Sequence, residues 1–166
     1  MDGSSLYDDD FVTWSEQQAE ALRALARSRP ELSNVVDWEN VIEEIETLGR
    51  SEWRGVESLL HQALAHILKG YCDPDSLSRI AWSVETRAFL DAARADFRNS
   101  MRRRIDMDKI WRDAFRSASQ EMLAYKRRVP PGIPSVSPFA LDDLLQESFT
   151  YEEALRHLYA RLDAPH

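Results

Sequence analysis

The chain has 166 residues, of which 43% are hydrophobic and 30% charged, and this composition excludes intrinsic disorder. Its length suits one domain over residues 1–166, with a core at about 8–162. With 21 basic and 29 acidic residues, the net charge of −8 disfavours nucleic acid and anionic membranes as partners of the whole chain.

Apolar residues recur at helical spacing through most of the chain, and the first helix is predicted after the acidic run at residues 8–10. Carboxylates suit a helix N-terminus because they accept from its free N–H groups. We expect this helix to end near Ser28, ahead of Pro30. Its predicted buried stripe comprises Phe11, Trp14, Gln18, Leu22 and Leu25.

A longer second helix is predicted from about residue 38 to about 69, with Asp37 as its N-cap. The apolar stripe keeps one phase through Gly49, which favours a continuous helix. A break at Gly49 is the alternative, because glycine commonly follows a helix end. The predicted stripe comprises Val41, Ile45, Leu48, Val56, Leu59, Ala63 and Ile67.

Two further helices follow the turn at residues 72–75. The third is predicted at about 77–99, with a stripe of Ile80, Ala81, Val84, Ala88, Ala92 and Ala95. The fourth is predicted at about 107–127 after the cap Asp106, with a stripe of Ile110, Trp111, Ala114, Phe115, Ala118 and Met122.

Proline interrupts the helical pattern at residues 129–137, where we expect a loop. Pro138 then opens a short helix through Leu145, and Thr150 with Glu153 forms a capping-box pattern before a last helix at 151–162. The fold class is therefore all-α: a small helical bundle of four main helices plus a proline-rich loop and short C-terminal helices.

Several segments together resemble a bacterial family catalogued as domain of unknown function 29, from about residue 7 to about 149. They are residues 37–49, the opening Tyr7, Asp10, Phe11 and Trp14, residues 64–69, Trp82 with Arg87, and Pro138 with Phe139 before Leu144, Leu145 and Phe149. The chain departs from the family pattern in a longer segment at 28–36 and in Gly70, where an aromatic residue is more typical.

The resemblance implies a helical bundle in a bacterial cytoplasm and assigns no activity. The polar residues of the resembling segments are candidate functional residues: Glu43, Glu44, Glu46, His66, Lys69 and Arg87. No cofactor is required by the sequence. A cytoplasmic location also agrees with the one cysteine, Cys72, and with residues 1–10, which lack a signal-peptide pattern.

Glu44, Glu52 and His66 project to one flank of the second helix and could hold a divalent metal or perform acid–base chemistry. The alternative is structural. In that case one of the glutamates pairs with Arg79 or Arg87, and His66 bonds to a backbone or side-chain oxygen. His61 falls on the polar face of this helix, where a solvated side chain is expected.

Three functional hypotheses remain after these observations. The first is a protein-interaction or regulatory module that binds a protein partner or itself, with Trp53 as a partner-surface candidate. The second is a metal-binding protein or enzyme that uses the Glu44, Glu52 and His66 cluster. The third is a weak nucleic-acid binder through the arginine clusters at 98–104 and 126–128, although acidic residues interrupt them.

Overall fold

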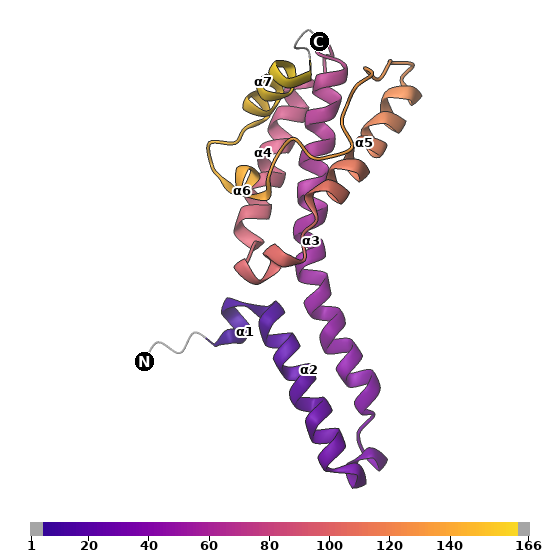
Figure 1. Ribbon diagram of the computed structural model, residues 1–166, viewed down its shortest axis with the longest axis vertical. Coiled ribbons are helices and arrows are strands. Elements are labelled where there is room, and N and C mark those ends of the chain that lie inside the picture. The colour runs from indigo at the N-terminus through magenta and orange to yellow at the C-terminus, as the bar shows by residue number, and fades with distance from the viewer. Residues whose placement is uncertain (1–4, 163–166) are drawn as a thin grey trace. The chain divides into compact units, whose positions relative to one another are not determined.

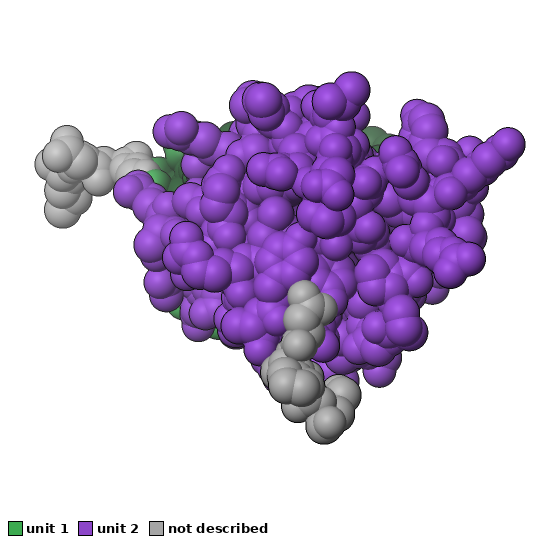
Figure 2. Space-filling model, turned by 90° about the horizontal axis from the view of Figure 1, so that it is seen from above, with its two compact units in different colours: residues 1–55, 97–105 green, residues 56–96, 106–166 purple. Residues whose placement is uncertain are grey.

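The computed structural model describes residues 5–162 (Figure 1). The described residues form helices and no strand, so the predicted all-α class is confirmed. They divide into two compact units, one of residues 1–55 with 97–105 and the other of residues 56–96 with 106–166 (Figure 2). The predicted single domain also includes residues 1–4 and 163–166, which lie outside the described residues. The single domain stays a prediction.

The first unit combines a helical hairpin with three short helical segments. Its elements are α1 (Leu6–Asp9), α2 (Phe11–Ser28), η1 (Pro30–Asn34), the first part of α3 (Trp38–Cys72) and η2 (Asn99–Arg103). Asp10 caps α2 by accepting from the Thr13 N–H at 3.1 Å. Figure 1 shows α2 running beside the N-terminal part of α3.

The buried face of α2 differs from the predicted stripe. Val12, Ser15 and Ala19 are buried, whereas Leu25 is 41% exposed. Small side chains line this face because α3 approaches closely: a Cβ added to Gly49 would lie 2.0 Å from Ser15 Oγ. The predicted residues Phe11 and Trp14 instead form an aromatic cluster with Tyr7.

Helix α3 is continuous through Gly49, as the phase of its pattern predicted. Its buried face includes positions that recur every seven residues: Ile42, Gly49, Val56, Ala63 and Gly70. Two members of the predicted stripe are wrong, because Val41 is 41% and Leu48 52% exposed. The predicted apolar stripe did not count Gly49 as a buried position. Because Gly49 packs closely against Ser15, Ile42 and Gly49 face the core in place of Val41 and Leu48.

The second unit contains the rest of α3 with α4 (Arg79–Asp96), α5 (Met107–Ala124), α6 (Leu141–Leu145) and α7 (Tyr151–Leu162). Helix α4 packs against α6 and α7. The predicted caps are confirmed, since Asp106 accepts from Lys109 N–H at 3.0 Å and Thr150 Oγ1 from Glu153 N–H at 3.2 Å. Trp111 ties α5 to the proline loop through a 2.8 Å bond from Nε1 to the Pro134 carbonyl.

The fourth predicted stripe is confirmed and the third is wrong. The buried residues of α5 include Ile110, Trp111, Ala114, Ala118 and Met122. On α4 the buried residues are Thr86, Leu90 and Ala93, while Ile80 is 78% and Val84 64% exposed. The apolar stripe read from the sequence therefore faces away from the core of this unit. Within residues 5–162, no helix has the length and apolar character needed to cross a bilayer.

Gly49→Ala should destabilise the protein, whereas Gly55→Ala should not. Alanine favours a helix by about 1 kcal/mol over glycine at both positions. Only at Gly49 does the new Cβ meet Ser15, since nothing lies within 4 Å of the same atom at Gly55. Overpacking costs about 1–3 kcal/mol, so urea denaturation should show opposite signs for the two variants. Equal stabilisation by both would contradict the close contact of α2 and α3.

Candidate functional site

The last turns of α3 carry two basic residues in a buried setting. Residues 63–71 are all buried, and among them His66 is 8% and Lys69 7% exposed. Because three residues make nearly one helical turn, both side chains lie on one face of α3. A buried cation needs a counter-charge or a full set of hydrogen bonds. Both residues find acidic partners on other helices.

His66 lies between two acceptors. Its Nδ1 is 3.0 Å from the Gln62 carbonyl oxygen, and its Nε2 is 2.5 Å from the Glu85 carboxylate on α4. The edge of Phe89 packs on the ring at 5.6 Å between centroids. This agrees with the structural alternative for His66, a side chain bonded to backbone and side-chain oxygens.

Lys69 joins three helices. Its Nζ lies 2.7 Å from the Glu121 carboxylate on α5 and 5.3 Å from the centre of the Trp82 ring on α4. An aromatic face attracts a cation, most strongly where water is excluded. Lys69 therefore holds α4 and α5 against the end of α3.

A polar cavity of about 380 Å³ opens beside Lys69. Its lining includes a second ion pair, between Asp73 at the end of α3 and Arg127 after α5, at 3.2 Å. In each pair one side chain is much more buried than the other: those of Lys69 and of Asp73, which directly follows α3, are 8% and 13% exposed, and those of Glu121 and Arg127 are 53% and 58% exposed. The cavity thus has charged groups of both signs at its base and at its rim.

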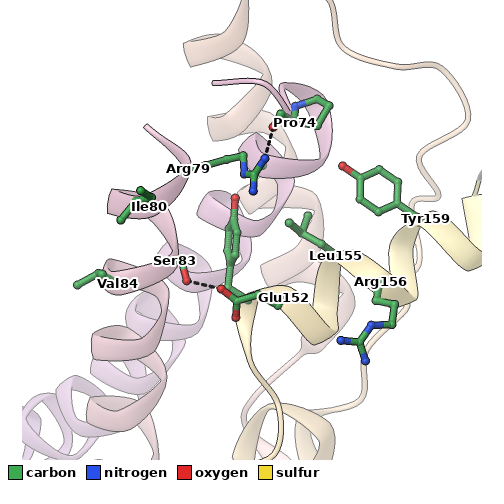
Figure 3. Close-up of a pocket in the computed structure, with 11 residues that line it drawn as sticks. Pro74, Arg79, Ile80, Ser83, Val84, Glu152, Leu155, Arg156 and Tyr159 are labelled. Atoms are coloured by element: carbon green, nitrogen blue, oxygen red, sulfur yellow. Dashed lines mark hydrogen bonds between the residues drawn. The ribbon is translucent and has the colours of Figure 1, made fainter. Parts of the chain in front are cut away.

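An apolar groove of about 620 Å³ lies between α4 and α7. Figure 3 shows Ile80 and Val84 of α4 on one side and Leu155 of α7 on the other. The Ser83 hydroxyl donates to Glu152 at 2.7 Å across this groove.

Tyr151 explains the departure from the family pattern at Gly70. A Cβ at position 70 would lie 1.9 Å from the Tyr151 hydroxyl oxygen, so the tyrosine from α7 occupies the space that a side chain there would need. Tyr151 is 4% exposed, and burial raises its pKa to about 12, although the charge of Arg79 acts in the opposite direction.

The other candidate residues do not join this cluster. Glu43, Glu44 and Glu52 are exposed in the first unit. Glu46 pairs with Arg23 in the same unit at 2.6 Å. The Arg87 side chain is 86% exposed, with the Asp91 carboxylate at 3.8 Å.

The proposed metal ligands are far apart along α3. Fourteen residues separate Glu52 from His66, about 21 Å of helix rise, and His66 bonds to Glu85 instead. Within residues 5–162 no group of three or more His, Cys, Asp or Glu side chains is arranged to hold a metal ion. A divalent metal stays a prediction.

The remaining candidates have partners of their own. Trp53 is half-buried, with the Arg54 guanidinium 5.5 Å from its ring centre. The arginine clusters belong to different units, 98–104 to the first and 126–128 to the second, and Arg103 and Arg104 pair with Glu16. Burial and the neighbouring Asp73 raise the pKa of Cys72 to about 11, in line with an unreactive thiol.

Two residues of the cavity were missed from the sequence as site residues. Glu121 lies on α5, and no spacing rule relates it to Lys69 far away in the sequence. Asp73 was assigned only to a turn. Lys69 itself was a candidate only as a polar residue of a segment that resembles the family.

Comparison with known proteins places the chain in a family. Its sequence matches the model described as Domain of unknown function DUF29 over residues 6–150. The chain belongs to the DUF29 family. No curated protein matches it. Its fold is similar to the crystal structure of an alpha-helical protein of unknown function from Rhodospirillum rubrum, with 32% identity, 93% of this chain and 98% of that chain covered, and a TM-score of 0.83.

Membership in DUF29 confirms the resemblance seen in the sequence and assigns no activity. The function of this chain is therefore unknown, and its chemistry has to be argued from its own cavities and surfaces. Two of these are the cavity beside Lys69 and the exposed apolar face of α4.

Replacing Lys69 by methionine should leave this DUF29 protein stable to within about 1 kcal/mol. A buried ion pair often contributes no more than an apolar pair of similar volume, and Glu121 stays hydrated because its side chain is 53% exposed. Lys69→Glu should instead destabilise by about 3 kcal/mol or more, since it leaves a buried charge unpaired. Chemical denaturation measures both variants. A large loss for Lys69→Met would contradict the replaceable pair.

His61 should make stability depend on pH. It is half-buried, not fully solvated as predicted, with Nε2 3.0 Å from Ser117 Oγ. Burial lowers the pKa of His61 below 6.5. The negative charge of Asp113 acts to raise this pKa, and the positive charge of Lys109 lowers it further. The unfolded chain therefore binds a proton first, so the free energy of unfolding falls as pH drops below about 6.5.

His61→Gln removes the titrating group. Urea denaturation at a series of pH values should show a flatter profile for this variant below about pH 6.5, and no relative change above it. Parallel profiles for variant and wild type would show that His61 titrates alike in both states.

Proposed function

We propose that the protein is a helical interaction module that associates with a second copy of itself through the exposed face of α4. The observation that supports this proposal best is the exposure of three large apolar side chains. Ile80 and Val84 on α4 are 78% and 64% exposed, and Leu77 in the turn before α4 is 101% exposed. Large apolar side chains gathered on one exposed helix face are typical of interaction sites. The groove beside α7 extends this apolar surface (Figure 3).

The spacing of this face favours another helix as its occupant. Ala81 and Ala88 of α4 are seven residues apart and both are exposed, and Ile80 and Val84 lie one turn apart beside them. A seven-residue repeat of this kind forms a seam between two helices. Small residues at regular intervals allow the two backbones to approach closely, and the larger side chains of the other helix fill the space above them.

Charge favours an antiparallel second copy over an unrelated helix. Arg79 lies at the N-terminal end of α4 and Asp91 toward its C-terminal end. Two antiparallel copies of α4 place these opposite charges together at both ends of the seam, by symmetry.

The cytoplasmic location, the bacterial source and the absence of a required cofactor stay predictions alongside this proposal. Fractionation of cells that produce the tagged protein tests the location. The acidic net charge of −8 supports a protein partner over nucleic acid, because phosphate backbones repel an acidic surface.

Sedimentation equilibrium tests the proposal. The wild type should be a dimer at concentrations on the order of 100 µM, and Val84→Glu should be a monomer because it places like charges in the seam. Leu123→Glu is the matched control, since Leu123 is 65% exposed on α5, away from this face. It should remain a dimer. A monomeric wild type, or dissociation by Leu123→Glu alone, would overturn the proposal.

A further inference from the structure

The cavity beside Lys69 has an unusual distribution of charge. Lys69 and Asp73 form its base, and the Asp73 N–H bonds to the Lys69 carbonyl at 2.9 Å, which continues the helical geometry of α3. One helical turn therefore separates the two, about 6 Å of rise. The base thus presents a buried ammonium and a largely buried carboxylate, one turn apart.

The counter-charges of this base are themselves exposed. Glu121 pairs with Lys69 at 2.7 Å and Arg127 with Asp73 at 3.2 Å, and more than half of each rim side chain is open to solvent. An exposed charge gains little from an ion pair, because water solvates it nearly as well. A buried charge left alone is unfavourable. The rim side chains are therefore replaceable counter-ions for base charges that always need one.

The balance of charge selects the chemistry of a ligand. A simple anion is attracted by Lys69 but repelled by the carboxylates of Asp73 and Glu121. A simple cation is attracted by these carboxylates but repelled by Lys69 and Arg127. A molecule that carries one charge of each sign matches both base residues at once. The volume of about 380 Å³ equals that of roughly a dozen water molecules in the liquid, and Ser76, Ser78 and Trp82 supply polar and aromatic walls.

We propose that this cavity binds a small zwitterion of the amino-acid class, whose carboxylate pairs with Lys69 and whose ammonium pairs with Asp73. Binding moves Glu121 and Arg127 outward into solvent, where both remain hydrated. The Trp82 ring, already 5.3 Å from the Lys69 ammonium, packs against the body of the ligand. This site is independent of the α4 face, so either proposal can fail without the other.

Isothermal titration of the full chain tests the site. The probes are glycine, 4-aminobutyrate and 6-aminohexanoate as zwitterions of increasing charge separation, with butyrate, butylamine and inorganic phosphate as single-charge probes. At least one zwitterion should bind about tenfold tighter than every single-charge probe, or about 1.4 kcal/mol. Absence of binding by all three zwitterions, or equal binding of butyrate or phosphate, would overturn the proposal.

Variants of the base and the rim should act in opposite directions. Lys69→Met and Asp73→Asn each remove a base charge and should weaken binding at least about tenfold. Glu121→Gln removes the competitor for Lys69 and should tighten binding several-fold. Glu153→Gln is its matched control, because this exposed glutamate on α7 pairs with Arg156 at 2.6 Å outside the cavity; it should change nothing.

The rim variant keeps the test decisive even where a base variant fails to fold. Weaker zwitterion binding by Glu121→Gln, or an equal change in Glu153→Gln, would contradict a replaceable rim. Circular dichroism of each variant separates loss of binding from loss of the fold.

Discussion

The burial of residues 63–71 at the end of α3 constrains the rest of the second unit. A helix covered on all sides exposes no polar face to water, so its two basic side chains need polar partners from other elements. Glu85 from α4 bonds to His66, and Glu121 from α5 forms an ion pair with Lys69. These contacts fix which faces of α4 and α5 turn toward α3, in addition to the apolar packing.

The exposed apolar face of α4 follows from the same constraint. Glu85 and Phe89 must meet His66, which turns Thr86, Leu90 and Ala93 inward and leaves Ile80 and Val84 on the opposite side. The cavity beside Lys69 has a related origin. Its buried base charges have counter-charges from the end of α5 and from the segment after it.

Much of the fold was predictable because it depends on local rules. Asp10, Asp106 and Thr150 cap helices by bonds to residues three positions later, and proline stops the helical pattern after α5. The faces of α2 and α4 were not predictable in this way. Gly49 and Gly70 have no side chain, so Ser15 packs closely against Gly49 and Tyr151 against Gly70. A search for periodic apolar residues does not detect contacts of this kind.

The candidate site was predictable only in part. His66 and Lys69 were candidates as polar residues of a segment that resembles the family, whereas nothing in the sequence relates Glu121 to Lys69 or Arg127 to Asp73. The grouping of Glu44 and Glu52 with His66 rested on a shared flank of one helix. Residues on one flank of a helix point in the same direction, but they can lie far apart, since each residue adds about 1.5 Å along the axis.

A double-mutant cycle on Lys69→Met and Glu121→Gln tests the central claim most directly, namely that the buried Lys69 needs a counter-charge from another helix. Unfolding free energies of the wild type, both single variants and the double variant give the coupling between the two side chains. We predict a coupling of about 3 kcal/mol or more, because Glu121→Gln alone leaves a buried charge unpaired, whereas the double variant removes both charges. A coupling of about 1 kcal/mol or less, as for a solvated ion pair, would contradict the claim.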